Sequence, residues 1–354
     1  MEGLRQLCAA LVREGVAPAA AAGFARRGND GWDMSFDGAT DADRDAFFDL
    51  ASLSKPMTAV AVARTAGLRT TSVESVLRDA EGTSVAAIPI EMLLAHRAGL
   101  EAHLPLYRTE RSPQAMLLAA ARSRRPELDR HGVGPFPPVY SDMGYLLVGE
   151  ALARATGHAD AGAAIAARVV GPLGLADMLG TARLLRARVA RFDRDVQPTE
   201  VVPERGGEVR GAVHDENAWA YARDAGCGHA GMFGTVEAVL RFGTATHDAI
   251  TSGTGPLAIA HEDLGWLVSE RPGGTLRAGF DGKSDEGSSA GTRASARTFG
   301  HLGFTGTSIW IDPAIPAVVV LLTNRVHPTR ENVRIREARP RIHDALFAMA
   351  VTPK

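Results

Sequence analysis

The segment AVVVLLTN, residues 317–324, is an almost unbroken apolar run of the kind that a buried strand shows. Residues 264–270 and 306–313 carry further strand patterns in the same part of the chain. Near the N-terminus, residues 19–25 predict a strand, and the turn residues 29–31 after it point to a hairpin. Strands from both ends of the chain therefore predict an antiparallel sheet.

Helical patterns lie between and around these strands. Residues 4–14 have the spacing of an amphipathic first helix, and residues 331–351 predict a closing helix that is interrupted at Pro340. From about residue 80 to 224, four segments repeat apolar residues at intervals near 3.6. This stretch predicts a mainly helical insertion.

The composition permits a large core and excludes several kinds of partner. Of 354 residues, 45% are hydrophobic, the net charge is -2, and the arginines are scattered, so we expect neither a nucleic-acid nor a membrane partner. The N-terminal segment is interrupted by Arg5, Arg13 and Glu14 and has no signal-peptide core, which predicts a cytoplasmic protein. Cys8 and Cys227 lie far apart and are expected to be reduced thiols.

Ser52 and Lys55 are the first candidates for chemistry. The chain has 39 lysine and arginine residues, but lysine occurs only at positions 55, 283 and 354. A lysine can lose its proton beside apolar surface and act as a base, whereas arginine cannot. Ser52 and Lys55 are three residues apart on one face of a predicted helix that Ser52 opens, so the amine can reach the hydroxyl. The alternative is a helix-capping serine followed by a solvated lysine.

Two further stretches carry candidate residues. In PPVYSDMGYLL, a loop stiffened by proline presents Tyr140 ahead of an apolar helix, and a phenol could relay a proton if a neighbouring ammonium lowered its pKa. In GHLGFTGTSIW, His301 and Gly303 stand at the start of a predicted strand, where glycine permits close approach of a ligand. The alternatives are a packing tyrosine and a structural histidine.

Taken in order, the three stretches resemble the serine beta-lactamase-like superfamily, in the branch of class C beta-lactamases, DD-peptidases and family VIII carboxylesterases. Its S-x-x-K element reads Ser52-Leu53-Ser54-Lys55 in this chain. The Y-x-N element reads Tyr140-Ser141-Asp142, and the K-T-G or H-x-G element reads His301-Leu302-Gly303. The stretch MLLAHRAGL is also similar to a turn of that family, and the resemblance covers about residues 16–345.

The resemblance implies an acyl-enzyme mechanism. Ser52 would be the nucleophile, Lys55 and Tyr140 would handle the proton, and the backbone amides of Ser52 and Phe304 would form the oxyanion hole. The substrate would be a small ester, amide or peptide. Neither a cofactor nor a metal is expected.

Two departures from the family pattern affect specificity. Asp142 replaces the usual asparagine, and its carboxylate would favour the charged form of Lys55 and give Tyr140 more weight as the base. His301 replaces a lysine that engages a substrate carboxylate, which argues against efficient beta-lactam hydrolysis and toward an esterase or amidase. Arg325 could supply a carboxylate contact, although a solvated arginine is the alternative. Substrate-binding candidates are therefore Asp142, His301, Gly303 and Arg325.

Two rival motifs have to be weighed. GSSAG places Ser289 in the pattern of an alpha/beta-hydrolase elbow, but it lies in a polar, glycine-rich loop without the required strand and helix. His214, Asp215 and His229 could bind a metal, but they lack a fixed helical spacing, and a hydrogen-bonding role is favoured.

The leading interpretation is a cytoplasmic serine hydrolase that acts on esters or small amides. Alternatives are a DD-peptidase-like or weakly beta-lactam-hydrolysing enzyme, an acyltransferase, and a catalytically silent binding module, which the intact Ser, Lys and Tyr disfavour. The expected fold is an α+β sandwich of the beta-lactamase/transpeptidase type, with an antiparallel sheet flanked by helices. One lobe comprises residues 1–79 and 225–354, and a mainly helical lobe comprises residues 80–224. Ser52 would lie between the lobes, with acyl specificity set by the insertion and by residues 280–296. Oligomeric state is left open.

Overall fold

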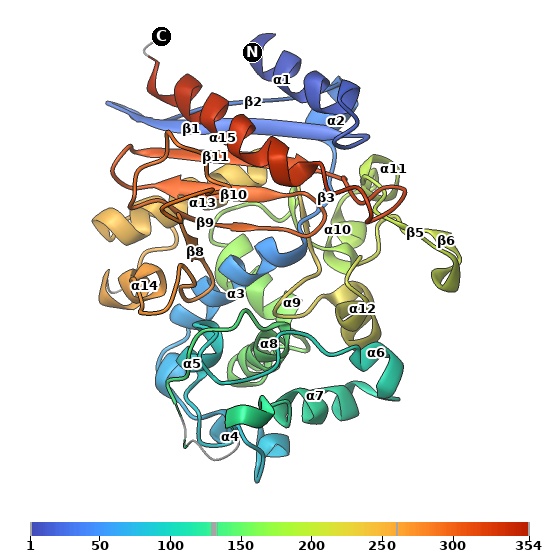
Figure 1. Ribbon diagram of the computed structural model, residues 1–354, viewed down its shortest axis with the longest axis vertical. Helices are drawn as coiled ribbons and strands as arrows, with labels where there is room; N and C mark the ends of the chain where they lie inside the picture. Colours follow the sequence, from blue (N-terminus) through green and yellow to red (C-terminus); the bar gives the residue numbers. More distant parts are fainter. Residues whose placement is uncertain (1, 129–131, 133, 260, 353–354) are drawn as a thin grey trace.

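A six-stranded antiparallel sheet forms the centre of the computed structural model, which describes residues 2–128, 132, 134–259 and 261–352 (Figure 1). The strands follow the order β2-β1-β11-β10-β9-β8, so the two ends of the chain meet in the middle of the sheet. Their bounds are β1 Ala20–Gly28, β2 Gly31–Gly38, β8 Asp281–Gly282, β9 Phe299–Leu302, β10 Ser308–Asp312 and β11 Ala317–Thr323. The predicted antiparallel sheet is confirmed.

Helices cover both faces of this sheet and fill the region below it in Figure 1. The longer helices are α1 Glu2–Arg13, α3 Ser54–Ala63, α7 Pro113–Ala121, α8 Asp142–Thr156, α13 Val236–Ser252, α14 His261–Val268 and α15 Ile335–Val351. The shorter ones are α2 Asp41–Asp45, α4 Val73–Val76, α5 Ile90–Leu94, α6 Leu106–Thr109, α9 Ala161–Ile165, α10 Ala182–Arg188, α11 Phe192–Asp195 and α12 Glu216–Ala222. None of these described helices is long and apolar enough to span a membrane.

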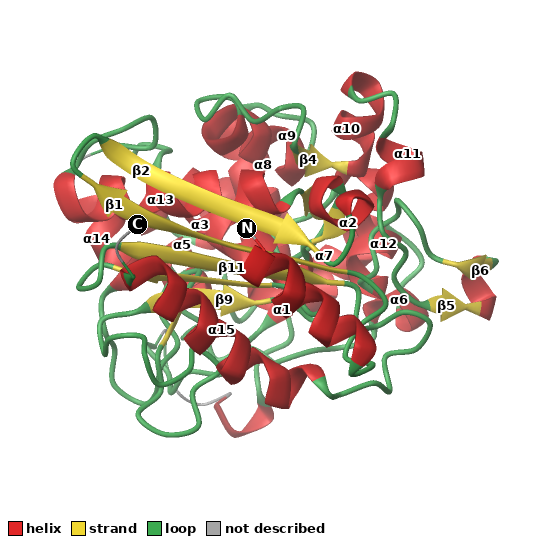
Figure 2. Cartoon of the chain, turned by 90° about the horizontal axis from the view of Figure 1, so that it is seen from above, coloured by secondary structure: helices red, strands yellow, loops and turns green. Residues whose placement is uncertain are grey.

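The central strand β11 explains why its sequence is continuously apolar. Successive side chains of a strand point to opposite faces. Val318 and Val320 pack into the core that contains α13, whereas Val319 and Leu321 pack into the core that contains α1 and α15. Figure 2 shows α1 and α15 side by side across one face of the sheet. Both faces of β11 are therefore buried, as the run predicted.

Two smaller sheets complete the fold. The first has the order β3-β7-β4, with bounds Phe48–Asp49, Met232–Gly234 and Leu179–Thr181, and its strand β3 comes just before Ser52 in the chain. The second is the hairpin of β5 Val201–Val202 and β6 Gly207–Glu208, which projects from the body of the molecule in both views (Figures 1 and 2). Of these short strands, β4, β5 and β6 interrupt the segment that was predicted to be mainly helical.

Two local predictions are wrong. Residues 264–270 were expected to form a strand, but α14 occupies most of this stretch, with Leu264 and Leu267 buried on one helical face. A short apolar run fits both periodicities, so its partners decide the outcome. The closing helix α15 also continues through Pro340, because the burial of Ile342 and Leu346 just after it holds the helix together. The division into two lobes remains a prediction.

Candidate active site

Ser52 lies in a tight 3₁₀ turn, Ala51–Leu53, between β3 and α3. The α-helix begins at Ser54 rather than at Ser52, and Ser52 does not cap it. Ala51 has a φ of 47°, a left-handed conformation that is unusual for alanine. Its amide donates to the buried carboxylate of Asp49 at 2.8 Å, which holds the chain in this conformation. The sheet that precedes Ser52 thus fixes a strained turn that presents the hydroxyl.

Lys55 lies beneath Ser52 with no solvent exposure. Its Nζ donates to Ser52 Oγ at 2.9 Å and to Asp142 Oδ1 at 2.7 Å. The alternative of a solvated lysine is therefore wrong. The turn, α3 and the first residue of α8 together bring the hydroxyl, the amine and a carboxylate into one connected group.

The charge of Lys55 is set by its neighbours. Burial alone would lower the pKa of Lys55, but the charge of Asp142 and the phenol of Tyr140 outweigh burial and raise it. Conversely, burial would raise the pKa of Asp142, but the charge of Lys55 outweighs burial and lowers it. Lys55 is therefore an ammonium and Asp142 a carboxylate at neutral pH.

Tyr140 is held over Lys55 by its neighbours. Lys55 Nζ lies 4.6 Å from the centroid of the phenol ring, and the ring of His96 stacks on Tyr140 at 4.8 Å. His96 Nδ1 also accepts a hydrogen bond from the amide of Ser141 at 3.0 Å, which fixes the loop beside the phenol. Burial raises the pKa of Tyr140, although the charge of Lys55 and a hydrogen bond with Ser52 oppose this. The resting phenol is therefore neutral.

The segment after β9 supplies the second backbone amide. Gly303 and Phe304 follow the end of β9, so they do not stand at the start of a strand as expected. The amides of Ser52 and Phe304 have no hydrogen-bond partner in the part of the chain that the structure describes. Both residues line the same pocket. Two unpaired amides beside a hydroxyl form an arrangement that can bind an oxyanion.

His301 is buried behind this segment, within β9, and is 5% exposed. Its ring lies 5.9 Å from that of Tyr140, and its Nδ1 hydrogen-bonds the carbonyl oxygen of Leu302. Burial and the charge of Lys55 lower the pKa of His301 to about 3, so the ring is neutral. His301 does not line the pocket, but its ring lies next to that of Tyr140, which does.

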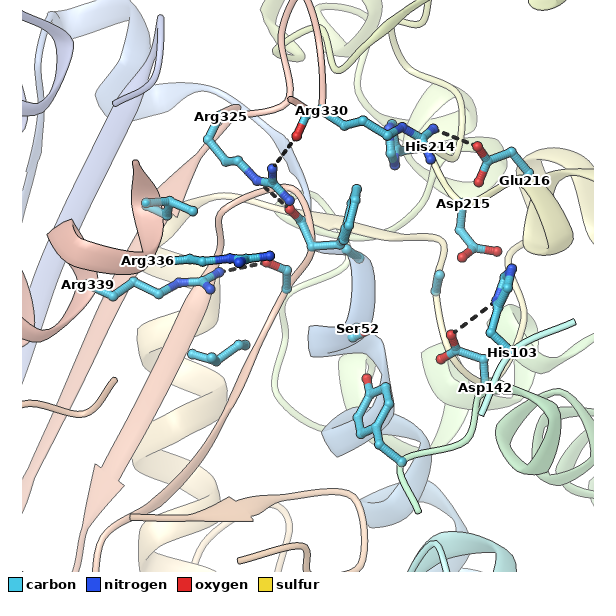
Figure 3. A pocket seen from close by; sticks show the side chains of 17 residues that line it. Ser52, His103, Asp142, His214, Asp215, Glu216, Arg325, Arg330, Arg336 and Arg339 are labelled. Atoms are coloured by element: carbon cyan, nitrogen blue, oxygen red, sulfur yellow. Dashed lines mark hydrogen bonds and ion pairs between the residues drawn. The ribbon is translucent and has the colours of Figure 1, made fainter. Parts of the chain in front are cut away.

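A cavity of about 510 Å³ opens above Ser52 (Figure 3). Tyr140, Asp142, Gly303, Phe304 and Arg325 line it together with His103, His214, Asp215, Glu216, Arg330, Arg336 and Arg339. Figure 3 shows Arg325, Arg336 and Arg339 toward one side and His103 with the carboxylates toward the other, with Ser52 between them. The guanidinium of Arg330 reaches the carboxylate side, where it pairs with Glu216. The loop of residues 280–296, all of which the structure describes, does not line this pocket. The prediction that this loop helps to set acyl specificity here is therefore wrong.

The arginine side of the pocket contains Arg325, which was a candidate from the sequence, and two arginines that the sequence did not identify. Arg325 donates to the carbonyl oxygen of Phe304 at 2.8 Å, so it is not a freely solvated side chain. Arg339 is 8% exposed and donates to the carbonyl oxygens of Gly303 and Thr307. Burial lowers the pKa of Arg339 to about 10. Arg336 is exposed at the rim. None of these three arginines has a carboxylate partner among the described residues.

The residues of the rejected motifs have other partners. His229 Nε2 bonds Asp215 Oδ1 at 3.0 Å, and its Nδ1 lies 3.2 Å from the thiol of Cys227. Burial disfavours the charged form of His229, but Cys227 and Asp215 outweigh it and raise the pKa of His229 well above its usual value. His214 bonds Glu200 at 3.1 Å. The favoured hydrogen-bonding role of these histidines agrees with the structure, and Ser289 lies in a turn outside the pocket.

Comparisons with known proteins identify the family of this chain. The Beta-lactamase family model matches residues 4–342. Among curated relatives, a putative D-alanyl-D-alanine carboxypeptidase of Escherichia coli K12 is 27% identical over 198 residues, which cover 53% of this chain and 45% of that protein. An N-acetylmuramyl-L-alanine amidase of Bacillus subtilis is 31% identical over 226 residues, which cover 53% of this chain and 44% of that protein. The chain thus spans less than half the length of these relatives.

Solved structures of the same fold cover nearly the whole chain. EstCE1, a hydrolase with promiscuous acyltransferase activity, matches with a TM-score of 0.71 and 19% identity over 98% of both chains. A beta-lactamase/D-alanine carboxypeptidase from Pseudomonas syringae matches with a TM-score of 0.70 and 16% identity over 99% of both chains. Since the family model spans nearly all of the sequence, this chain belongs to the Beta-lactamase family.

Proposed function

We propose that this chain is a serine hydrolase that forms an acyl-enzyme on Ser52 and cleaves esters or small amides. The observation that carries the proposal is the contact of 2.9 Å between Lys55 Nζ and Ser52 Oγ at the floor of a pocket. An alcohol is a weak nucleophile until a neighbouring group assists the loss of its proton. The buried Lys55 and Tyr140 are positioned to give this assistance.

In the proposed reaction, Tyr140 first loses its proton to solvent, and Ser52 Oγ then attacks the carbonyl carbon while its proton passes to the Tyr140 phenolate. Lys55 is charged at rest, so it stabilises a phenolate rather than accepting the proton itself. The bond to the leaving group then breaks, and the leaving group takes the proton from Tyr140. Water hydrolyses the acyl-enzyme by the reverse proton path.

The unpaired amides of Ser52 and Phe304 would bind the oxygen that becomes negative. Gly303 allows this segment to approach Ser52, because a Cβ at Gly303 would lie 2.7 Å from the carbonyl oxygen of Leu50. Asp142 borders the substrate and sets the charge of Lys55. We infer that His301 positions the ring of Tyr140 and affects the substrate only through that ring.

The test is hydrolysis of p-nitrophenyl butyrate by the wild type, by Ser52→Ala and by Ser289→Ala as the matched serine control. We expect Ser52→Ala to lose turnover by at least about a thousandfold, whereas Ser289→Ala retains it. A fluorophosphonate should add to the wild type and to Ser289→Ala but not to Ser52→Ala, as measured by intact mass. Equal turnover in all three proteins would refute the assignment of the nucleophile.

A second candidate function is a carboxypeptidase-like activity on peptides. The observation that favours it is the set of Arg325, Arg336 and Arg339 on one side of the pocket without carboxylate partners in the described chain. A peptide that ends in a free carboxylate would supply that partner. Release of D-alanine from a peptide ending in D-alanyl-D-alanine, compared with its C-terminal amide, tests this candidate. Equal rates on both peptides would exclude a role for the terminal carboxylate.

A further inference from the structure

A second cavity, of about 680 Å³, lies beside the catalytic pocket. It is bordered by α6, the projecting β5–β6 hairpin and α12, which lie together on one side of the molecule in Figure 1. Four arginines line it. The proposed chemistry of Ser52 uses none of the cavity's own arginines, so the cavity requires a separate explanation.

Trp219 organises two of these arginines. The guanidinium carbon of Arg205 lies 4.6 Å from the centroid of the indole, and that of Arg223 lies 4.9 Å from it. Stacking on an aromatic ring fixes the plane of a guanidinium and leaves the N–H groups at its edge available for hydrogen bonds in that plane. The indole therefore holds the guanidinium groups of Arg205 and Arg223 in place beside the cavity.

Neither of these arginines is neutralised. Arg205 donates to the carbonyl oxygen of His214 at 3.2 Å, and neither Arg205 nor Arg223 forms an ion pair with another described residue. Arg223 has a φ of 51°, so its backbone holds a left-handed conformation that is costly for a residue other than glycine. Burial lowers the pKa of Arg205, although the charges of Asp49 and Glu216 oppose this.

The remaining charges leave the cavity positive. Arg108 stacks on Tyr107 at 5.2 Å and also lacks an ion pair within the described chain. The carboxylates of Glu200 and Glu216 are both occupied by Arg330, at 2.6 Å each. Glu204 is the remaining lining carboxylate, and it is exposed. The four lining arginines therefore face three lining carboxylates, which leaves a formal charge of +1.

The cavity is joined to the catalytic pocket. Glu216 and Arg330 line both cavities, so their ion pair lies where the two cavities meet. His214 forms a second link, because its carbonyl oxygen binds Arg205 and its ring stacks on Phe304 at 5.6 Å. A molecule bound at Ser52 can thus extend past this ion pair.

We propose that this second cavity, the Trp219 pocket, binds a carboxylate on the part of the substrate that is remote from the bond cleaved at Ser52. Two preorganised guanidinium forks match the two oxygens of a carboxylate, which is the reason for the choice of ligand. The substrate class is then a half-ester or half-amide of a dicarboxylic acid. This inference rests on the proposed function, so binding and turnover are tested separately.

Binding is measured in Ser52→Ala, which cannot turn the probe over. Monoethyl esters of dicarboxylic acids, from succinate to suberate, are titrated while tryptophan fluorescence is followed. We expect a saturable change from at least one ester, and loss of that change in the additional Trp219→Phe variant. Adding Arg205→Gln and Arg223→Gln should weaken binding roughly a hundredfold, about tenfold for each charged hydrogen-bonding partner. The matched control adds Arg111→Gln and Arg188→Gln, two exposed arginines elsewhere, and should bind as the parent does.

Equal affinity of the Arg205→Gln/Arg223→Gln protein and its parent would overturn the proposal, as would the absence of a saturable response to every ester. Turnover is then measured with mono-p-nitrophenyl esters of the same acids and with neutral p-nitrophenyl esters of equal length. The ratio of KM for the charged ester to KM for the neutral ester should rise roughly a hundredfold in the Arg205→Gln/Arg223→Gln protein. Binding without hydrolysis by the wild type would support the Trp219 pocket and refute the proposed hydrolase.

Discussion

The charge of Lys55 depends on one carboxylate, that of Asp142, at 2.7 Å. Asp142 raises the pKa of Lys55, and it also raises that of Tyr140. Replacing Asp142 with asparagine leaves an oxygen that Lys55 can bind but removes the charge. The pKa of both groups should then fall.

We therefore predict that Asp142→Asn shifts the ascending limb of the pH profile, where kcat/KM rises as the base loses its proton, to lower pH. Each unit by which the pKa falls gives about tenfold more of the basic form at a fixed pH below it. In the wild type, the rate should still be rising at about pH 9, because burial raises the pKa of Tyr140. The measurement is kcat/KM for p-nitrophenyl butyrate from pH 6 to 10, corrected for spontaneous hydrolysis.

Glu216→Gln is the control for this shift, because Glu216 is a carboxylate of the same pocket that pairs with Arg330 instead. The ascending limb of its kcat/KM profile should stay at the wild-type position. A limb that does not move in Asp142→Asn would show that the proton is taken by a group other than Lys55 or Tyr140.

The side chains of the site differ in how far the sequence could predict them. Ser52, Lys55 and Tyr140 could be proposed from short motifs, and the structure brings them together. The position of His96 under Tyr140 and that of Arg339 in the pocket could not be proposed, because each depends on a contact between distant segments. A local pattern contains no information on such a contact.

Among the elements, the turn between β9 and β10 places the amide of Phe304. A Cβ added to Gly303 would lie 2.0 Å from Thr307 Oγ1 and 2.7 Å from the carbonyl oxygen of Leu50, so the turn would have to move away from Ser52. We predict that Gly303→Ala lowers kcat by about a hundredfold or more, through the oxyanion hole. The free energy of unfolding should fall by about 1–3 kcal/mol. Ester kinetics and urea denaturation measure the two effects.

Gly265→Ala is the matched control, since a Cβ there would have no neighbour within 4 Å. Gly265 lies within α14, where alanine favours the helix, so this variant should keep its activity and its stability. Wild-type kcat in Gly303→Ala would mean that the Phe304 amide does not bind the oxyanion.

Strands β10 and β11 and helix α14 show why some elements could be predicted from the sequence and others could not. β10 and β11 are rich in isoleucine and valine, which favour buried strands, and both strands were predicted. The stretch that became α14 is short, and its packing against α13 and α3 selected the helix. Short elements such as β5 and β6 leave too few residues for a period to be recognised.

Across the whole molecule, ion pairs join residues 80–224 to the segments on either side. Lys55 binds Asp142, His229 binds Asp215, and Arg330 binds both Glu200 and Glu216. Burial would raise the pKa of Glu200, but its hydrogen bonds with His214 and Arg330 outweigh burial and lower this pKa to about 2. The pKa of Asp215 is also lowered, because the charge of His229 outweighs burial.

A carboxylate whose pKa is lower in the folded than in the unfolded state stabilises the fold above its unfolded pKa, and this contribution is lost as the pH falls toward the folded value. We predict that the free energy of unfolding begins to fall below about pH 6.5, where buried neutral histidines such as His301 would gain a proton on unfolding, and that it falls further below about pH 4, where the carboxylates do. Urea denaturation at pH 7, 5, 4 and 3 measures it. Glu200→Gln should be less stable at pH 7 but decline less steeply, and an unchanged slope would contradict this origin of the acid sensitivity.

The burial of Lys55 also has a practical consequence for labelling. Lysine occurs at three positions in the chain, and one of them is enclosed between Ser52 and Asp142 with no exposed surface. Lys283 donates to the carbonyl oxygens of Thr292 and Ala294, so it too is partly engaged. An isothiocyanate dye, which labels amines without acylating Ser52, should therefore modify few sites of the folded protein and leave catalysis intact, whereas the unfolded chain would be labelled at Lys55 as well. The extent of labelling of Lys55 thus reports the opening of the fold around its own catalytic centre.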